Sequence, residues 1–473
     1  MSVASTAFSQ LMKLAGREAP DFVTIEEGAP AMKTRFQAEA AAAAVLAATG
    51  TIAADLRRQF IGRGQSVSAS TREAAAALVS FVHQSFEDAT RAPPSRPADL
   101  NGGGRGTPAM GFFATQDGRH IYLHPSFPDS AAKLHKLMGE PADAEAVAKT
   151  TLTWNAMDLE NAIAAAGICG AMCRTPEEWD ASEQGRILAT RPLIEVTKIA
   201  DSPPEPLPGG DAPLSGVRVL DLTRVLAGPT CARTLAQYGA DVLYIASPNL
   251  PATAFFISDT NHGKLSAWLD LKTPEGLAQL KDLVKTTDVF GQGYRGGALE
   301  RMGLGPLDLA RLRPGIIYTS INAYGHEGPW AQRPGWEQLA QTVTGVAHLH
   351  GEHMGAKAPM LQPGAVADYT TGFLAALGTL IALDRRARFG GSYCVRVSLS
   401  QTLTWLRGLG IAGPEHLAAV QPHSPEEIAG WQVDSQSGFG PMRHLRPPVT
   451  LSETPARWAR PVVPLGTHEP AWP

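Results

Sequence analysis

The chain has 473 residues, of which 44% are hydrophobic and 18% charged, and its formal net charge at pH 7 is −4. A chain of this length exceeds one compact core and predicts two or three domains. The slightly acidic balance excludes a basic field over the whole molecule, so we expect no nucleic-acid partner, although local basic sites can hold a phosphate. Four cysteines are too few for a disulfide framework and favour a reducing, cytoplasmic compartment.

The N-terminal stretch lacks a basic segment followed by an apolar one, so we expect no secretory signal. The most apolar early segment, residues 38–54, is rich in alanine and carries Glu39. A bilayer span needs about 20 strongly apolar residues. The segment is therefore predicted to be a buried helix, and no membrane partner is expected.

Two distant segments of the chain are similar to each other. Residues 46–52 (LAATGTI) match residues 374–380 (LAALGTL), and the same offset of 328 positions continues without gaps through Gly62 and Gly390 to Ser70 and Ser398. Each copy predicts a helix, a glycine turn, a short strand and a second helix. This pattern favours duplication of a half-unit, although two helices rich in alanine and leucine can also resemble each other by composition.

The two copies differ at one position that matters for chemistry. Asp368 of the second copy faces Ala40 of the first, with Glu39 one position earlier. The segment AVADYTTG around Asp368 precedes an apolar run, which predicts a carboxylate near a helix start and partly away from water. A carboxylate in that setting can act as a nucleophile on an acyl carbonyl. We therefore predict that the C-terminal copy is the catalytic one.

Between the two copies, the sequence indicates a small α/β domain. Residues 91–108 form a linker or exposed loop rich in Pro, Gly and Arg, in which residues 102–106 (GGGRG) are a candidate lid or a plain linker. Asp117-Gly118 lies between two β-prone runs and predicts a hairpin within residues 111–124. Helices are predicted over residues 130–138 and 158–166, and residues 202–213 form a second, proline-rich linker.

After Leu214 the pattern becomes that of alternating strands and helices. Strands are predicted over residues 217–222, 241–245, 288–290 and 316–321, and a helix over residues 230–238 that Gly239 ends. Alternation of this kind implies a mostly parallel sheet covered by helices, which binds ligands at the carboxyl ends of its strands.

The fold class predicted from these patterns is α/β, with a Rossmann-like, mostly parallel sheet domain and a smaller α/β domain N-terminal to it. The predicted boundaries are a helical segment at 1–96 that resembles a partial repeat of 365–410, the small domain and linker at 97–212, the Rossmann-like domain at 213–410, and a C-terminal tail at 411–473.

Several motifs in the predicted Rossmann-like domain suit an anionic ligand. The turn at 225–229 leaves backbone amides near a helix start, although it lacks a G-x-G-x-x-G pattern and also suits an ordinary strand-to-helix turn. Cationic and flat apolar side chains follow, which can hold phosphates and face a purine; the alternative is a solvated surface. These residues are Lys264, Leu269, Lys272, Arg301 and Met302. Tyr324 is a hydrogen-bond donor or a packing residue.

Two motifs raise the question of a metal. His348, His350 and His353 form H-x-H-x-x-H, and on a strand the first two would share a face. A loop rich in Gly and His explains the pattern equally well. Cys169 and Cys173 form C-x-x-x-C, which favours structural thiols over zinc ligands. We therefore predict no metal site.

Taken together, these segments resemble the class III CoA-transferase family, which includes formyl-CoA and carnitine CoA-transferases and the methylacyl-CoA racemases. The resemblance is strongest from Leu214 to about Trp405. It rests on the ordered segments at 216–221, 227–229, 239–242, 272–276, 297–299 and 301–303 and on the stretch around Asp368, with the family's tail resembled at 451–455 and 464–468. Residues 60–212 resemble the family's smaller domain, so the domain order is permuted.

The resemblance implies that Asp368 attacks an acyl-CoA thioester, and that the reaction passes through a mixed anhydride and an aspartyl-CoA thioester before a carboxylic acid accepts CoA. It implies that Leu269, Lys272, Arg301 and Met302 hold the adenine and its phosphates, with Lys264 in the same site. Leu226, Ala227, Tyr294 and Tyr324 match positions along the pantetheine arm. An acyl-CoA and a carboxylic acid are then substrates, no cofactor is bound permanently, and a homodimer is expected.

The sequence departs from the family pattern at three sites. Leu265 replaces an arginine that many members carry, Leu226 replaces the glutamine of formyl-CoA transferase, and Trp336-Glu337 replaces the His-Asp pair of the racemases. An epimerase needs two opposed acid/base groups, so CoA transfer is the first hypothesis. The alternatives are an acyl-CoA isomerase or racemase of the same fold and a catalytically silent CoA-binding scaffold.

Overall fold

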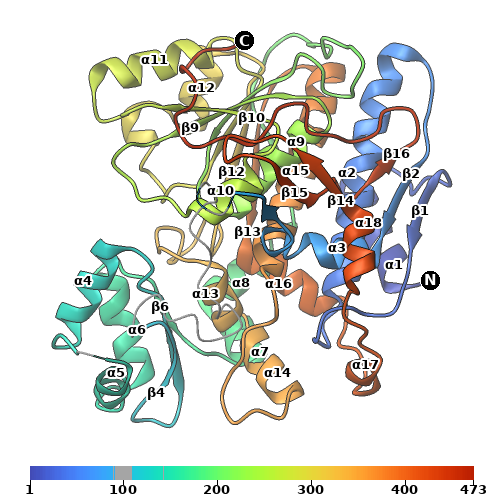
Figure 1. Cartoon of the computed structure of the whole chain (residues 1–473). Helices are drawn as coiled ribbons and strands as arrows, with labels where there is room; N and C mark the ends of the chain where they lie inside the picture. Colours follow the sequence, from blue (N-terminus) through green and yellow to red (C-terminus); the bar gives the residue numbers. More distant parts are fainter. Residues whose placement is uncertain (89, 91–108, 142) are drawn as a thin grey trace.

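A seven-stranded sheet forms the centre of the molecule (Figure 1). The structure, a computed structural model, describes residues 1–88, 90, 109–141 and 143–473. The strand order is β10-β9-β8-β11-β12-β13-β7. The six parallel strands are β8 (Arg218–Leu222), β9 (Asp241–Ala246), β10 (Lys264–Trp268), β11 (Val289–Gln292), β12 (Ile317–Asn322) and β13 (Ser392–Ser398). The predicted α/β fold with a mostly parallel sheet is confirmed.

Helices cover both faces of this sheet. One face packs on α11 (Pro274–Val284) and α12 (Pro306–Leu312), and the other on α9 (Ala227–Gln237) and α15 (Val366–Phe389). Gly239 follows α9 with φ +98°, as predicted from its place at the end of a helical run. The remaining helices of this region are α10 (Ala254–Thr260), η2 (Glu300–Met302), α13 (Glu337–Val343), α14 (Val346–His353) and α16 (Leu399–Gly408).

The duplicated segment has the same structure twice. Helix α2 (Ala38–Ile61) and helix α15 begin and end at positions that differ by the predicted offset. Each ends at a glycine with positive φ, Gly62 at +70° and Gly390 at +66°, where a side chain would be strained. Each is followed by a strand and a helix, which in the first copy are β2 (Val67–Ser70) and α3 (Thr71–Ala77).

The first copy is not a separate domain, because α2 packs along α15 inside one apolar core (Figure 1). Helix α1 (Val3–Leu14) covers α2, and β1 (Val23–Glu26) pairs in parallel with β2. By length and composition α2 and α15 are each apolar enough to cross a membrane, but both are largely buried within the protein. Alanine-rich α2 is thus a core helix, as its sequence predicts.

A small domain carries the predicted hairpin. Strands β4 (Gly111–Ala114) and β5 (His120–Leu123) pair antiparallel across Asp117-Gly118, and β6 (Gly170–Met172) adds to β5. Its helices are α4 (Pro128–Leu137), α5 (Ala144–Thr151), α6 (Ala156–Ala165), α7 (Pro176–Ala181) and α8 (Glu183–Ala189). The chain then leaves this domain earlier than the predicted boundary at 212, because β7 (Glu195–Ala200) joins the main sheet antiparallel to β13.

The C-terminal tail pairs with strands of residues 1–88 and then runs along the edge of the main sheet. Strand β16 (Thr450–Leu451) pairs with β2, while β14 (Gln432–Ser435) and β15 (Met442–Leu445) form a sheet with β3 (Ser85–Phe86). Two short helices precede these strands, α17 (Glu415–Ala418) and α18 (Pro425–Trp431). The last residues run along the edge strand β10, where the His468 amide donates to the Ser266 carbonyl at 2.8 Å. The tail therefore covers an edge that would otherwise expose backbone groups.

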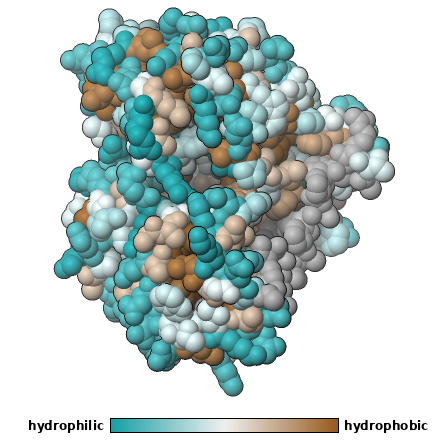
Figure 2. All heavy atoms as spheres, turned by 90° about the vertical axis from the view of Figure 1, so that its left-hand side faces the viewer, coloured by the Kyte–Doolittle hydropathy of each residue, from teal (hydrophilic) through white to brown (hydrophobic). Residues whose placement is uncertain are grey.

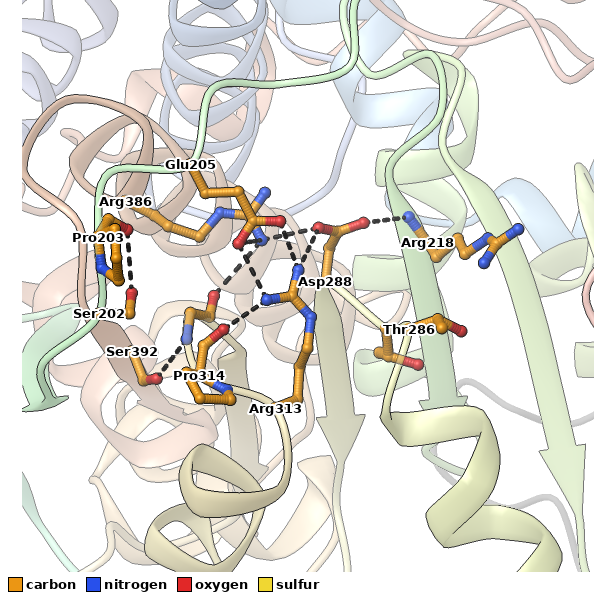
Figure 3. Close-up of polar contacts among 12 residues, drawn as sticks. Ser202, Pro203, Glu205, Arg218, Thr286, Asp288, Arg313, Pro314, Arg386 and Ser392 are labelled. Carbon is orange, nitrogen blue, oxygen red and sulfur yellow. Dashed lines mark hydrogen bonds and ion pairs between the residues drawn. The ribbon is translucent and has the colours of Figure 1, made fainter.

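An ion-pair cluster fixes the proline-rich linker to the amino ends of the strands (Figure 3). Arg386, whose side chain is fully buried, lies 2.7 Å from Asp288, and Arg313 pairs with Glu205 of the linker at 2.5 Å. Asp288 also accepts the backbone amide of Arg218 at 2.8 Å. The cluster thus joins α15, the strand ends and the linker.

Asp288→Ala is expected to destabilise the protein strongly. It leaves the Arg386 guanidinium buried with Glu205 as its nearest carboxylate at 3.9 Å, and breaking a buried pair typically costs about 3–5 kcal/mol. Chemical denaturation measures the free energy of unfolding. Asp282→Ala is the control, because its pair with Lys285 is mostly exposed and worth little. Equal losses in the two variants would contradict this role of the cluster.

Candidate active site

Asp368 lies in the first turn of α15, as predicted. Helix α15 begins at Val366, and its N-cap residue Ala365 offers no side-chain hydrogen bond. The side chain of Asp368 is partly exposed, while its neighbours Ala367 and Tyr369 are buried. A helix N-terminus stabilises a carboxylate through its unpaired amides and its dipole. The position therefore combines a reachable carboxylate with a rigid support.

A second carboxyl group, that of Glu337, lies beside Asp368. Glu337 is the first residue of α13 and is 4% exposed. Burial raises the pKa of Asp368 to about 7. Burial and the nearby Asp368 charge raise the pKa of Glu337 well above its usual range. Two carboxyl groups in such a pair share one proton near neutral pH, so Glu337 stays neutral when Asp368 ionises.

Hydrogen bonds hold Glu337 in place. Its Oε1 accepts the Ala367 amide at 2.8 Å and Nε2 of Gln341 at 3.1 Å. Gln341 in turn accepts the amide of Gln362 at 2.8 Å. All of these groups are buried. Because Ala367 precedes Asp368, the same contacts fix the backbone that carries the candidate nucleophile.

The predicted anion-binding turn lies next to this pair. Val225 has φ +70°, a strained conformation for a β-branched residue that functional sites often retain. Leu226 and Ala227 follow it at the start of α9. A side chain at Gly372, one turn after Asp368, would clash with the Ala227 carbonyl. The start of α9 thus packs closely against the first turns of α15.

The structure contradicts a phosphate-binding role for Lys264. Its side chain is fully buried, where its Nζ lies 2.7 Å from Asp221 Oδ2 and donates to the Pro229 carbonyl at 2.9 Å. A fully buried lysine needs such a partner, and burial lowers its pKa. Lys264 is therefore a structural residue that links β10, β8 and α9.

Other predicted nucleotide-binding residues gather at the carboxyl ends of β10 and β11. Leu269 is buried in the apolar cluster against which Tyr294 and Met302 pack. Lys272 and Arg301 are exposed beside it, and neither forms an ion pair within the described part of the chain. Two free cations at the rim of an apolar platform suit a phosphorylated purine nucleoside.

Tyr324 is 3% exposed and supports the loop after β12 rather than offering its hydroxyl to an open cleft. Its ring lies against Gly335 and edge-on to Trp330, 5.4 Å between centroids. Its carbonyl accepts Nε2 of Gln184 at 2.8 Å. The sequence left open whether Tyr324 is a hydrogen-bond donor or a packing residue, and in the structure it is a packing residue.

The small domain closes one side of the site. Trp336, next to Glu337, packs on Phe127 and His124 of that domain, with ring centroids 5.7 and 5.9 Å apart. Burial lowers the pKa of His124 to about 4, so it is neutral at pH 7. Arg224 lies over the Phe127 ring at 5.5 Å. Figure 2 shows this side of the molecule hollowed between the sheet-containing part above and the small domain below.

A small pocket lies at the carboxyl ends of β8 and β9, with a cavity volume of about 20 Å³, room for about one water molecule. Arg224, Tyr244 and Asn261 line it, together with Val225 and Pro229 at the start of α9. Asn261 is 1% exposed, and its Nδ2 has no hydrogen-bond partner in the described part of the protein. An arginine and an unpaired amide donor at one cavity favour a bound carboxylate.

The metal motifs do not assemble. His348, His350 and His353 lie on helix α14, so the segment is neither the strand that would pair the first two nor the loop considered as the alternative. Among the described residues, no group of three or more His, Cys, Asp or Glu side chains is placed to hold a metal ion. Cys169 and Cys173 are buried free thiols, and burial raises the pKa of each to about 12.

The sequence correctly predicted a helix start at Asp368 but did not indicate Glu337 beside it, or the pocket residues Arg224 and Asn261. Glu337 was noted only as a departure from a racemase pattern, and Arg224 and Asn261 were not singled out. For Glu337, the signal in the sequence is an acidic residue that directly follows a tryptophan at the start of a helix. The GGGRG segment considered as a lid lies outside the described residues.

Comparison with known proteins matches this geometry to one family. The family model of CoA-transferase family III matches residues 4–204 and 214–427, on either side of the linker. The chain belongs to this family. The two matches flank the linker that the ion-pair cluster anchors, which agrees with two joined, incomplete copies of the family fold.

Named relatives are CoA-transferases. The chain is 30% identical over 385 residues to an acetyl-coenzyme A transferase of Hypoxylon pulicicidum (74% of this chain, 65% of that protein). It is 37% identical over 233 residues to the human succinyl-CoA:glutarate CoA-transferase (46% and 51%). The chain thus spans about two thirds or less of these relatives. A CAIB/BAIF family protein of Brucella suis is 27% identical with a TM-score of 0.39, covering 49% of this chain and 65% of that one.

Asp368→Asn is expected to raise the melting temperature at alkaline but not at acidic pH. The folded-state pKa of about 7 exceeds the ordinary value of 3.8, so the native state disfavours the ionised form. The wild type therefore loses stability as pH rises through about 7, and the amide does not. Thermal unfolding from about pH 4 to about pH 8.5 tests this. Asp129→Asn, at an exposed position, is the control, and identical pH trends in both variants would contradict the raised pKa.

Proposed function

We propose that this protein moves CoA from an acyl-CoA thioester to a free carboxylic acid, with Asp368 as the nucleophile. The observation that carries the proposal is the Asp368–Glu337 pair at the start of α15, in a chain of CoA-transferase family III. The family match and the relatives' names support CoA transfer as the reaction class. The covalent steps are our inference from the chemistry of the pair.

The reaction begins when the ionised Asp368 carboxylate attacks the thioester carbonyl. The C–S bond breaks, CoA leaves as a thiolate, and a mixed anhydride forms. The thiolate then attacks the aspartyl carbonyl, which releases the donor acid and leaves an aspartyl-CoA thioester. The acceptor carboxylate attacks that thioester to give a second anhydride, and the thiolate takes the new acyl group. Asp368 is regenerated, so atoms and charge balance without another reactant.

The surroundings of Asp368 fit these steps. A pKa of about 7 means that a large fraction of Asp368 is ionised at neutral pH. The raised pKa also means that the surroundings stabilise the carboxylate less than water does, which favours its attack as a nucleophile. Neutral Glu337 adds no repelling charge when the nucleophile ionises. Trp336 and Phe127 cover the site with aromatic surface, which limits hydrolysis of the anhydride by water.

The CoA tail is assigned to the carboxyl ends of β10 and β11. Leu269 and Met302 face the adenine, Lys272 and Arg301 hold its phosphates, and Tyr294 lines the path towards Asp368. Leu226 and Ala227, at the start of α9, flank the pantetheine arm. CoA enters as a substrate, and we expect no permanently bound cofactor. A homodimer stays a prediction from the family resemblance, and a cytoplasmic location stays a prediction from the low cysteine count.

The small pocket at Arg224, of about 20 Å³, is assigned to the tip of the acyl chain. Arg224 and the unpaired Nδ2 of Asn261 suit a second carboxylate at its far end. Relatives named for succinyl-CoA, glutarate and malate act on dicarboxylic acids, which supports this substrate class. An isomerase or racemase remains the alternative, and deuterium exchange at the α-carbon of a 2-methylacyl-CoA would identify it.

Asp368→Ala is expected to abolish CoA exchange and keep CoA binding. Loss of the nucleophile removes every covalent step, so the rate should fall by at least about 10³-fold. The measurement is the appearance of new acyl-CoA from a panel of acyl-CoA donors and free acids. Asp129→Ala controls for the change of residue type. Exchange at the wild-type rate in the Asp368 variant would remove this carboxylate from the mechanism.

Arg224→Met is expected to lower kcat/KM for succinate or glutarate by about 10- to 100-fold, because a charge-assisted hydrogen bond to the second carboxylate is lost. Rates with butyrate or valerate should change little, since these acids lack that group. Comparing the two acid classes in the same variant cancels general damage to the site. Equal losses for both classes would argue against a carboxylate subsite.

A further inference from the structure

The N-terminal copy repeats the scaffold of the site without its chemistry. Ala40 occupies the position that corresponds to Asp368. The neighbouring Glu39 turns its Oε1 to the amides of Ala31 and Met32, at 2.8 and 2.5 Å. This carboxylate therefore holds a short loop and is not offered to a ligand. We call residues 1–88 the N-terminal unit. Because this unit lacks the catalytic carboxylate, its position beside the site suggests a role other than catalysis.

One chain of hydrogen bonds leads from this unit to the acid pair. Thr34 Oγ1 donates to Oε1 of Gln362 at 3.2 Å, and both residues are buried. The Gln362 amide donates to Gln341, and Gln341 donates to Glu337, which also accepts the Ala367 amide. A hydroxyl of the N-terminal unit is thus linked through two glutamines to the residue that shares a proton with Asp368.

A second route reaches the other side of Asp368, through the 3-10 turn η1 (Ser80–Val82). The Leu78 carbonyl accepts the amide of Ala365, the N-cap residue of α15, at 3.1 Å. Ser80 Oγ donates to the Tyr369 hydroxyl at 3.0 Å, and the Phe81 ring stacks on the Tyr369 ring with centroids 6.2 Å apart. The unit therefore holds both ends of the first turn of α15.

Tyr369 is also fixed from the opposite side. Its hydroxyl donates to Asp259 of α10 at 2.7 Å, and Asp259 pairs with Arg233 of α9 at 2.8 Å. The Asp368 carboxylate, by contrast, accepts no hydrogen bond from the described residues. Its position is therefore set by the backbone of α15. Ala365 and Tyr369 contact the N-terminal unit directly, and Ala367 is linked to it through Glu337 and the two glutamines.

We propose that the N-terminal unit acts as a built-in second subunit for the active site, with Thr34 and Ser80 as positioning residues for the Glu337–Asp368 pair. This inference rests on the proposed CoA transfer. In this proposal the N-terminal unit contributes no reacting atom. It fixes the turn of α15 that carries the nucleophile.

Thr34→Val and Ser80→Ala test the two routes separately. Each removes one hydroxyl from a side chain that does not touch the reacting atoms. We expect kcat to fall by about two- to tenfold in each variant, the effect of one lost hydrogen bond. KM for the acyl-CoA should stay within about twofold, because the CoA-binding residues are untouched. Thr34→Ser, which restores the hydroxyl, should recover the wild-type kcat.

Matched controls come from the same unit. Thr51 is fully buried like Thr34, but its hydroxyl bonds only to the Ala47 carbonyl within α2. Ser9 bonds only to the Ser5 carbonyl within α1. Thr51→Val and Ser9→Ala should therefore keep the wild-type kcat. If kcat fell as much in these two controls as in Thr34→Val and Ser80→Ala, the effect would be general destabilisation, and the proposal would be overturned.

A second measurement does not depend on activity. Hydrogen–deuterium exchange followed by mass spectrometry should show faster exchange in peptides covering residues 362–369 for Thr34→Val and Ser80→Ala, and unchanged exchange for the two controls. If the wild type transferred no CoA, the proposed function would fail, and this exchange would still decide whether the N-terminal unit orders the turn. Wild-type kcat and wild-type exchange in both site-facing variants would overturn the inference.

Discussion

Two carboxyl groups share a poorly hydrated position at the start of α15, and they cannot both be ionised at neutral pH. Burial raises the pKa of Asp368 to about 7 and raises the pKa of Glu337 well above its usual range, because little water reaches either charge. The pair thus supplies one reactive carboxylate and one neutral partner. The strained turn at Val225, the aromatic cover from the small domain and the buried glutamines all serve to keep this arrangement dry and fixed.

The duplicated architecture explains how a single chain maintains such a costly arrangement. Helices α2 and α15 pack together in one apolar core, so α15 is buried along most of its length and is exposed mainly in its last turn, at Arg388 and Phe389. The tail adds strands to β2 and β3 of residues 1–88, and the Arg386 cluster fastens the linker at the far end of α15. An apolar core of this extent can offset the cost of keeping two carboxyl groups away from water.

Local patterns in the sequence were enough for the elements and for Asp368. Alternating strands and helices, Gly239 after α9 and the Asp117-Gly118 hairpin each follow from short-range preferences, and the AVADYTTG segment places an acid at a helix start. Pairings across the fold were not predictable in this way. Lys264 looked like a phosphate ligand because its partner, Asp221, lies 43 positions away on another strand. Glu337 comes beside Asp368 only because α13 packs near the start of α15. The histidine segment was considered as a strand or a loop, whereas in helix α14 His348 lies 3.2 Å from Glu352, one turn later.

The most direct test of this account is to trap the acylated carboxylate. The protein is incubated with an acyl-CoA donor and hydroxylamine, digested, and analysed by mass spectrometry. The account predicts a hydroxamate on the peptide that contains Asp368 and on no other, with none in Asp368→Ala. A hydroxamate on Glu337 or elsewhere, or none at all while CoA exchange proceeds, would contradict the claim that Asp368 is the covalent nucleophile.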